Sequence, residues 1–177
     1  PARDDTPTRP RPFLNEGTIW TAVFVLLGLA ARTVRWRGDT PLWGDEAAVA
    51  LNLLDRGYRA LAGALDLGQV APLGFLWIER TLLLGLGPSE AALRLAAFVA
   101  GTASVLCFCW LGHLLFAVPL HLRERPNAEG LGEPAPHPEL ASVLPFAIFA
   151  VAYYPIRYSA ELKPYALDLL GACLLQG

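Results

Sequence analysis

Three long apolar segments divide the chain, and each is long enough to form a helix that crosses a lipid bilayer. They cover residues 16–36, 95–120 and 140–159, and residues 165–177 begin a fourth. A helix that spans a bilayer needs about 20 predominantly apolar residues. The pattern therefore predicts an all-α, polytopic membrane protein whose helices cross the bilayer at least three times.

Between the first two apolar segments, residues 45–65 have the pattern of an amphipathic helix. Asp45 is of a type that often caps a helix N-terminus. Asp45, Asn52 and Arg56 form a polar stripe on a segment that is otherwise apolar. Such a helix lies along a membrane surface more readily than it crosses the bilayer. We therefore expect residues 45–65 to form an interfacial helix.

A second helical pattern, residues 71–87, carries Glu79 and Arg80 at its centre. Each of these charges would cost roughly 2.5–3.5 kcal/mol at the middle of a bilayer. We therefore predict that residues 71–87 form an interfacial or re-entrant helix and do not cross the membrane.

The polar segments indicate how the helices are oriented. Residues 1–12 are polar and rich in proline, which predicts a disordered cytoplasmic tail, and residues 121–139 predict a polar cytoplasmic loop. Arg123 and Arg125 directly follow the second apolar segment, and basic residues in this position mark the cytoplasmic side. Two crossings between these basic flanks place the loop 35–94 on the outer side.

Composition supports a membrane protein and argues against a nucleic-acid-binding protein. Hydrophobic residues make up 54% of the chain and charged residues 17%, whereas a soluble domain typically carries about 25% charge. The net charge of −2 argues against a nucleic-acid partner. Cys107, Cys109 and Cys173 all lie in apolar segments, so we interpret them as buried hydrophobic residues and not as metal ligands.

The predicted topology places two ionisable clusters on the same face of the membrane, Asp45-Glu46 and Glu161 with Lys163. Ionisable residues at a membrane boundary are candidates for function. Adjacent carboxylates at the start of a helix could act as a general base, bind a metal, or only cap the helix. Glu161 and Lys163 could equally form a simple interfacial charge pair.

Five short motifs follow one another in a recognisable order. W-x-D-E comes after the first apolar segment, Q-x-x-P-L opens the second amphipathic pattern, and that pattern leads into L-G-x-S-E. R-L then opens the second crossing, and Y-S-x-E-x-K-P-Y stands at the outer end of the third. In this order the chain resembles the N-terminal part of the GT-C membrane glycosyltransferases, closest to the protein O-mannosyltransferase and aminoarabinose transferase-like group. The resemblance covers about residues 13–177, and we expect further helices to follow in the full-length protein.

The resemblance implies a glycosyltransferase of the plasma (inner) membrane with its active site on the non-cytoplasmic side. Such an enzyme moves a sugar from a polyprenyl-phosphate donor to a lipid, glycan or protein acceptor. It implies that Asp45 is the general base and that its neighbour Glu46 positions the base or the acceptor. The residues that it places near the donor phosphate or substrate are Arg94, Glu161, Lys163 and Tyr165.

One departure from the family concerns the loop before the second amphipathic pattern. Many relatives carry Lys-Pro-Pro where this chain has Val-Ala-Pro at 70–72. Lys163 is then the candidate replacement for the missing lysine, or else the donor sits differently. Some members bind a divalent metal through the first-loop acid, but we expect no required metal or other cofactor here.

Two other functions fit the same residues. In a transporter or channel subunit, Asp45, Glu161 and Lys163 would line a polar path, although transporter sites usually lie near the middle of the bilayer. In an inactive membrane scaffold they would serve only to hold the helices together.

Overall fold

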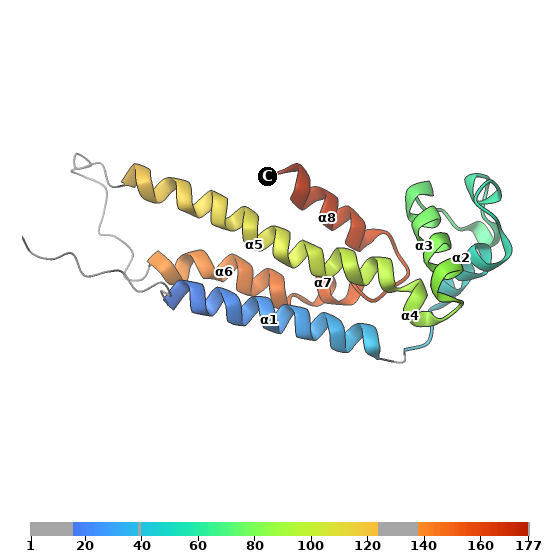
Figure 1. Cartoon of the computed structure of the whole chain (residues 1–177), viewed down its shortest axis with the longest axis horizontal. Helices are drawn as coiled ribbons and strands as arrows, with labels where there is room; N and C mark the ends of the chain where they lie inside the picture. The colour runs from blue at the N-terminus through green and yellow to red at the C-terminus, as the bar shows by residue number, and fades with distance from the viewer. Residues whose placement is uncertain (1–15, 39, 124–137, 177) are drawn as a thin grey trace, which may run out of the picture.

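The computed structural model describes residues 16–38, 40–123 and 138–176, and these residues form helices joined by loops, without strands. The all-α prediction is therefore confirmed for the described residues. The long helices run along the long axis of the molecule, and α2, α3 and α4 gather at one end of them (Figure 1). The elements are α1 (Glu16–Arg37), α2 (Gly44–Asp55), η1 (Ala60–Ala62), η2 (Asp66–Gly68), α3 (Leu73–Leu86), α4 (Glu90–Leu93), α5 (Leu95–Arg123), α6 (Pro138–Val151), α7 (Tyr153–Tyr158) and α8 (Tyr165–Leu175).

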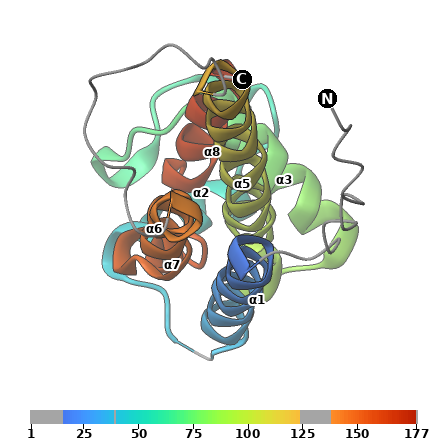
Figure 2. The ribbon, with the colours of Figure 1, turned by 90° about the vertical axis from the view of Figure 1, so that its left-hand side faces the viewer.

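Helix α5 contacts α1, α6 and α8, so these helices form one bundle, seen end-on in Figure 2. Small residues lie where the helices approach most closely. A Cβ atom added at Gly28 would lie 3.0 Å from the backbone oxygen of Ala150, and one added at Gly101 would meet the side chain of Ser159. Small residues at helix–helix contacts are typical of helices that pack in membranes.

Among the residues that the structure describes, two helices are long and apolar enough to cross a membrane, α1 and the Leu95–Gly112 part of α5. Their length and composition give weak support for a membrane location. The segment 140–159, predicted as a third crossing, is divided between α6, which ends at Val151, and α7, which begins at Tyr153.

Pro155 explains this division. Proline has no N–H, and its ring collides with the carbonyl group four residues earlier, so the helix does not continue through Val151. Ala152 between the two helices has extended backbone. The carbonyl oxygen of Ala150 instead accepts a hydrogen bond of 2.8 Å from Nη1 of Arg32, which is fully buried. An arginine of α1 therefore satisfies a backbone group at the end of α6.

Helix α2 is shorter than the helix predicted at residues 45–65. Its last residue is Asp55, and Arg56 already has extended backbone. Asn52 is buried and pairs with the backbone of Asp66, which donates to Oδ1 at 2.8 Å. Arg56 forms an ion pair of 2.6 Å with the Asp66 side chain. Two members of the predicted polar stripe, Asn52 and Arg56, therefore bind the loop that follows α2.

Helix α3 covers most of the segment predicted as a helix at 71–87, but Glu79 does not face an interface. Its side chain is 0% exposed, and neither carboxylate oxygen has a hydrogen-bond partner among the described residues. It lies one turn from Phe75 and Leu83, which belong to the hydrophobic core formed by α2, α3 and their neighbours. This burial raises the pKa of Glu79 to about 8. Glu79 therefore lies in the interior of the protein, beside this core.

Some predictions fall outside the described residues. The predicted tail 1–12 and residues 124–137 of the predicted loop are among these. The loop predicted at 121–139 is helical at both of its ends, because α5 continues to Arg123 and α6 begins at Pro138.

The contact between α5 and the residues after α7 predicts the effect of enlarging Gly101. In a Gly101→Ala protein the new methyl group meets the Ser159 side chain and lies 3.2 Å from its Cα, so we expect a loss of about 1–3 kcal/mol in the free energy of unfolding. The control is Gly85→Ala in α3, where nothing lies within 4 Å and alanine should be neutral or stabilising by up to about 1 kcal/mol. Thermal unfolding in detergent, followed by circular dichroism, measures both. Equal melting temperatures for the two variants would contradict the packing.

The buried Glu79 predicts an unusual dependence of stability on pH. Its pKa is about 8 in the folded chain, against an ordinary value of 4.5. Between these pH values the folded state keeps the proton that the unfolded state has lost, so stability falls as pH rises, by up to about 1.4 kcal/mol per unit. Denaturation in urea at a series of pH values should show this slope, and Glu79→Gln should remove it. Asp55→Asn, a change at an exposed carboxylate, should keep it; the slope surviving in the Glu79→Gln protein would disprove its origin.

Candidate functional site

The start of α2 and the loop between α7 and α8 meet at the end of the bundle that carries α2 to α4 (Figure 1). Nζ of Lys163 lies 2.8 Å from Oδ2 of Asp45, and these side chains are 26% and 51% exposed. The other carboxylate oxygen of Asp45 accepts a hydrogen bond from the backbone N–H of Glu46. The structure therefore brings the two predicted ionisable clusters into direct contact.

The contact between Asp45 and Lys163 changes the acidity of both groups. The hydrogen bond and positive charge of Lys163 lower the pKa of the Asp45 carboxyl, and Asp45 raises the pKa of Lys163. Both groups therefore carry their charges at neutral pH. Because the pair is partly exposed, it contributes only about 0–1 kcal/mol to stability. A ligand can thus separate the two charges at little cost to the fold.

Glu46 lies next to Asp45 in sequence but is buried, with 1% of its surface exposed. Its Oε2 accepts a hydrogen bond of 3.0 Å from the N–H of Trp43, the residue that caps α2. Its Oε1 accepts one of 2.6 Å from the N–H of Leu162, 116 residues further along the chain. The expectation that Asp45 is the N-cap is therefore wrong, because Asp45 lies inside the first turn and the side chain that reaches back to the cap is Glu46.

Arg94 lies between α4 and α5 and is 3% exposed. Its Nη1 donates to the carbonyl oxygen of Thr40 at 2.8 Å, and its Nη2 lies 3.5 Å from Oε2 of Glu46. These atoms face inward, toward the buried carboxylate, and not toward the exposed pair of Asp45 and Lys163. In this structure Arg94 therefore compensates the charge of Glu46.

Glu161 is also buried, and its main partner is a residue that the sequence analysis did not include in the site. Nε of Arg157 in α7, four residues earlier, donates to Oε1 of Glu161 in the loop after this helix. Oε2 of Glu161 lies 3.9 Å from Nζ of Lys163. The spacing of four residues between Arg157 and Glu161 was the available signal, because residues so spaced lie on one face of a helix.

Aromatic rings extend from the ion pair along α7. Nζ of Lys163 lies 5.8 Å from the centre of the Tyr165 ring, within the range of a cation–π contact. Tyr165 contacts Tyr158, which in turn stacks on Tyr154. All six residues that the sequence analysis placed in the site thus lie in one connected network, which continues into a row of tyrosines that it did not predict.

The network presents an exposed carboxylate, a partly exposed cation and an aromatic ring, which lie on the buried side chains of Glu46, Arg94 and Glu161. Exposed Lys163 can bind an anion, and Asp45 can accept a proton once its oxygen is released. Among the described residues, His, Cys, Asp and Glu side chains form no group of three or more that could hold a metal ion.

Comparison of the chain with protein-family models, with curated proteins and with solved structures gave no match. The functional argument therefore depends on the motifs and on the geometry of these residues.

The two neighbouring carboxylates should respond differently to removal. Glu46→Ala takes away the acceptor for two backbone N–H groups and leaves buried Arg94 without its charge partner, so we expect a loss of about 3–5 kcal/mol. Asp45→Ala removes an exposed ion pair and should cost at most about 1 kcal/mol. Urea denaturation in detergent compares the two proteins directly. If Asp45→Ala proved as destabilising as Glu46→Ala, the assignment of separate roles would be wrong.

Proposed function

We propose that the chain carries the acceptor-activating and phosphate-binding residues of a GT-C-like glycosyltransferase, with Asp45 as the base and Lys163 as the cation. The single observation that supports this most is the ion pair of 2.8 Å between two partly exposed groups from distant parts of the chain. The reaction requires this combination, because a sugar–phosphate bond breaks while an acceptor hydroxyl loses its proton. The ordered motifs around both residues support the same family.

In the proposed reaction the donor phosphate draws Lys163 away from Asp45. The freed carboxylate of Asp45 accepts the proton of the acceptor hydroxyl, whose oxygen forms a bond to the anomeric carbon. The bond from that carbon to the phosphate oxygen breaks, and its electron pair leaves with the polyprenyl phosphate. Lys163 stabilises the negative charge of this leaving group. Glu46 takes no proton, because its oxygens are buried against backbone donors and Arg94.

The proposal includes insertion in the plasma (inner) membrane with the Asp45–Lys163 pair on the non-cytoplasmic side, where a lipid-linked donor and an acceptor would meet. The length and apolar composition of the two candidate spanning helices support insertion in a membrane. The start of α2, which carries Asp45, lies at one end of the bundle (Figure 1). The same position disfavours the transporter alternative, since a transport site is expected along the helices and near their middle.

The test is sugar transfer by the full-length protein in lipid vesicles, with a panel of radiolabelled polyprenyl-phosphate sugars. Asp45→Asn should fold and insert normally but lose transfer by about a hundredfold or more, because a general base typically contributes 10²–10⁴ in rate. Lys163→Gln should both lower kcat and raise the KM for the donor, because Lys163 binds the donor phosphate and stabilises the leaving group.

The matched control is Asp66→Asn, which breaks a comparable exposed ion pair of 2.6 Å with Arg56 away from the site. It should leave transfer unchanged. Turnover retained by Asp45→Asn, or lost equally in the Asp66→Asn protein, would exclude Asp45 as the base.

A further inference from the structure

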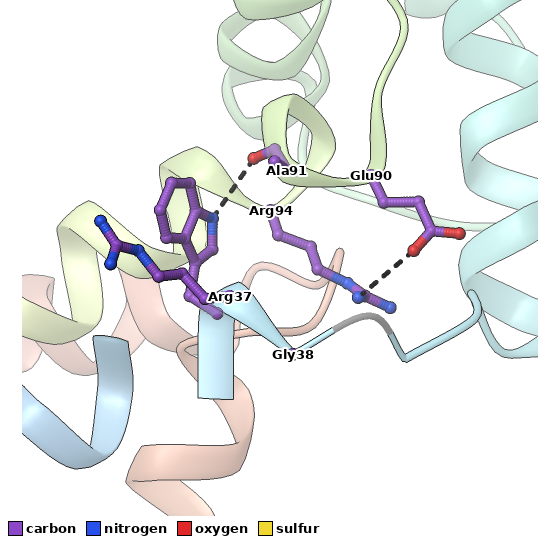
Figure 3. Close-up of a pocket in the computed structure, with 6 residues that line it drawn as sticks. Arg37, Gly38, Glu90, Ala91 and Arg94 are labelled. Atoms are coloured by element: carbon purple, nitrogen blue, oxygen red, sulfur yellow. Dashed lines mark hydrogen bonds and ion pairs between the residues drawn. The ribbon is translucent and has the colours of Figure 1, made fainter. Parts of the chain in front are cut away.

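A pocket of about 350 Å³ lies where the end of α1 meets α4, and none of the transfer steps proposed above uses it. Its lining residues are Trp36, Arg37, Gly38, Glu90, Ala91 and Arg94. Figure 3 shows Glu90 joined to Arg94 by an ion pair, with the side chain of Arg37 extending in the opposite direction from that of Arg94. The pocket therefore combines two arginines, one carboxylate and one large aromatic ring.

The polar groups of this pocket are incompletely paired. Arg94 is 3% exposed, and its Nε has no hydrogen-bond partner among the described residues. The Glu90 carboxylate is 49% exposed and lies 3.9 Å from Nη1 of Arg94, too far for a direct hydrogen bond. Arg37 is exposed at the end of α1, so its side chain has room to turn toward a bound group.

The position of the pocket indicates what kind of ligand reaches it. Helix α1 is long and apolar enough to cross a membrane, and Trp36 and Arg37 are its last residues. Tryptophan and arginine at the end of a spanning helix lie at the level of the lipid headgroups. The indole N–H of Trp36 donates to the Ala91 carbonyl and its ring stacks on Phe98, which fixes this wall of the pocket.

We propose that the pocket binds the headgroup of a zwitterionic phospholipid that carries a primary amine, as in phosphatidylethanolamine. The phosphate lies between Arg37 and Arg94, and the ammonium group donates to the carboxylate of Glu90. Charge balance favours this ligand over a purely anionic lipid, because Glu90 and buried Glu46 offset the two arginines. The inference rests on the proposed membrane placement, but not on sugar transfer.

The experiment places the full-length protein in nanodiscs made from equal amounts of phosphatidylethanolamine, phosphatidylcholine and phosphatidylglycerol. The lipids retained after mild detergent extraction are then counted by native mass spectrometry. Phosphatidylethanolamine should be retained about tenfold more than the other lipids, since one charge-assisted hydrogen bond separates it from phosphatidylcholine. Phosphatidylcholine has the same phosphate, but its quaternary ammonium cannot donate to Glu90.

Two variants identify the groups that bind the headgroup. Arg37→Gln should lower retention of all three lipids, because all share the phosphate. Glu90→Gln should preserve binding of a phosphate but abolish the preference for the primary amine. Arg35→Gln is the matched control, because Arg35 lies in the same last turn of α1 and does not line the pocket.

The outcomes separate this proposal from the proposed function. A protein that enters nanodiscs without preferring phosphatidylethanolamine, or that responds to Arg35→Gln as to Arg37→Gln, would overturn the lipid site and leave sugar transfer unaffected. A protein that shows the preference but transfers no sugar would overturn the enzyme and leave the lipid site.

Discussion

The carboxylate of Glu46 connects three parts of the chain that are far apart in sequence. It accepts hydrogen bonds from the N–H groups of Trp43 and Leu162, and it lies beside the guanidinium of Arg94. A charged carboxylate in a protein interior is tolerated only when donors and an opposite charge surround it. The start of α2, the loop after α7 and the junction of α4 with α5 must therefore stay together for this group to remain buried.

This requirement explains how two adjacent acids come to have different surroundings. Successive residues of an α-helix point about 100° apart, so when Glu46 turns into the protein, Asp45 points along the surface. The loop that is held by Leu162 then presents Lys163 to Asp45. The buried neighbours thus position the pair of Asp45 and Lys163. Because the interaction between these two side chains is weak, a ligand can separate them.

The helices and the apolar segments could be predicted from the sequence, because they depend on local composition. The order of motifs indicated a set of residues that the structure brings into contact. It did not predict which of two acids is buried, since Asp45 and Glu46 are equally polar and only the contact with Leu162 distinguishes them. The break at Ala152 had a local signal in Pro155, but hydropathy averaged over a span conceals one proline. For Glu79 the sequence held two conflicting signals. Its charge suggested a surface position, whereas its spacing of four residues from Phe75 and Leu83 indicated the core.

Arg94 belongs both to the buried network around Glu46 and to the pocket beside α1. Its Nη2 lies near Glu46, and the residue also lines the pocket together with Glu90. A headgroup phosphate near Nε would therefore share the arginine with Glu46 without entering the surface that Asp45 and Lys163 form. In the proposed enzyme, Arg94 would then bind the lipid headgroup beside the end of α1 and also hold the start of α2 through Glu46. A single buried guanidinium would in this way set the distance between the membrane surface and the reacting carboxylate.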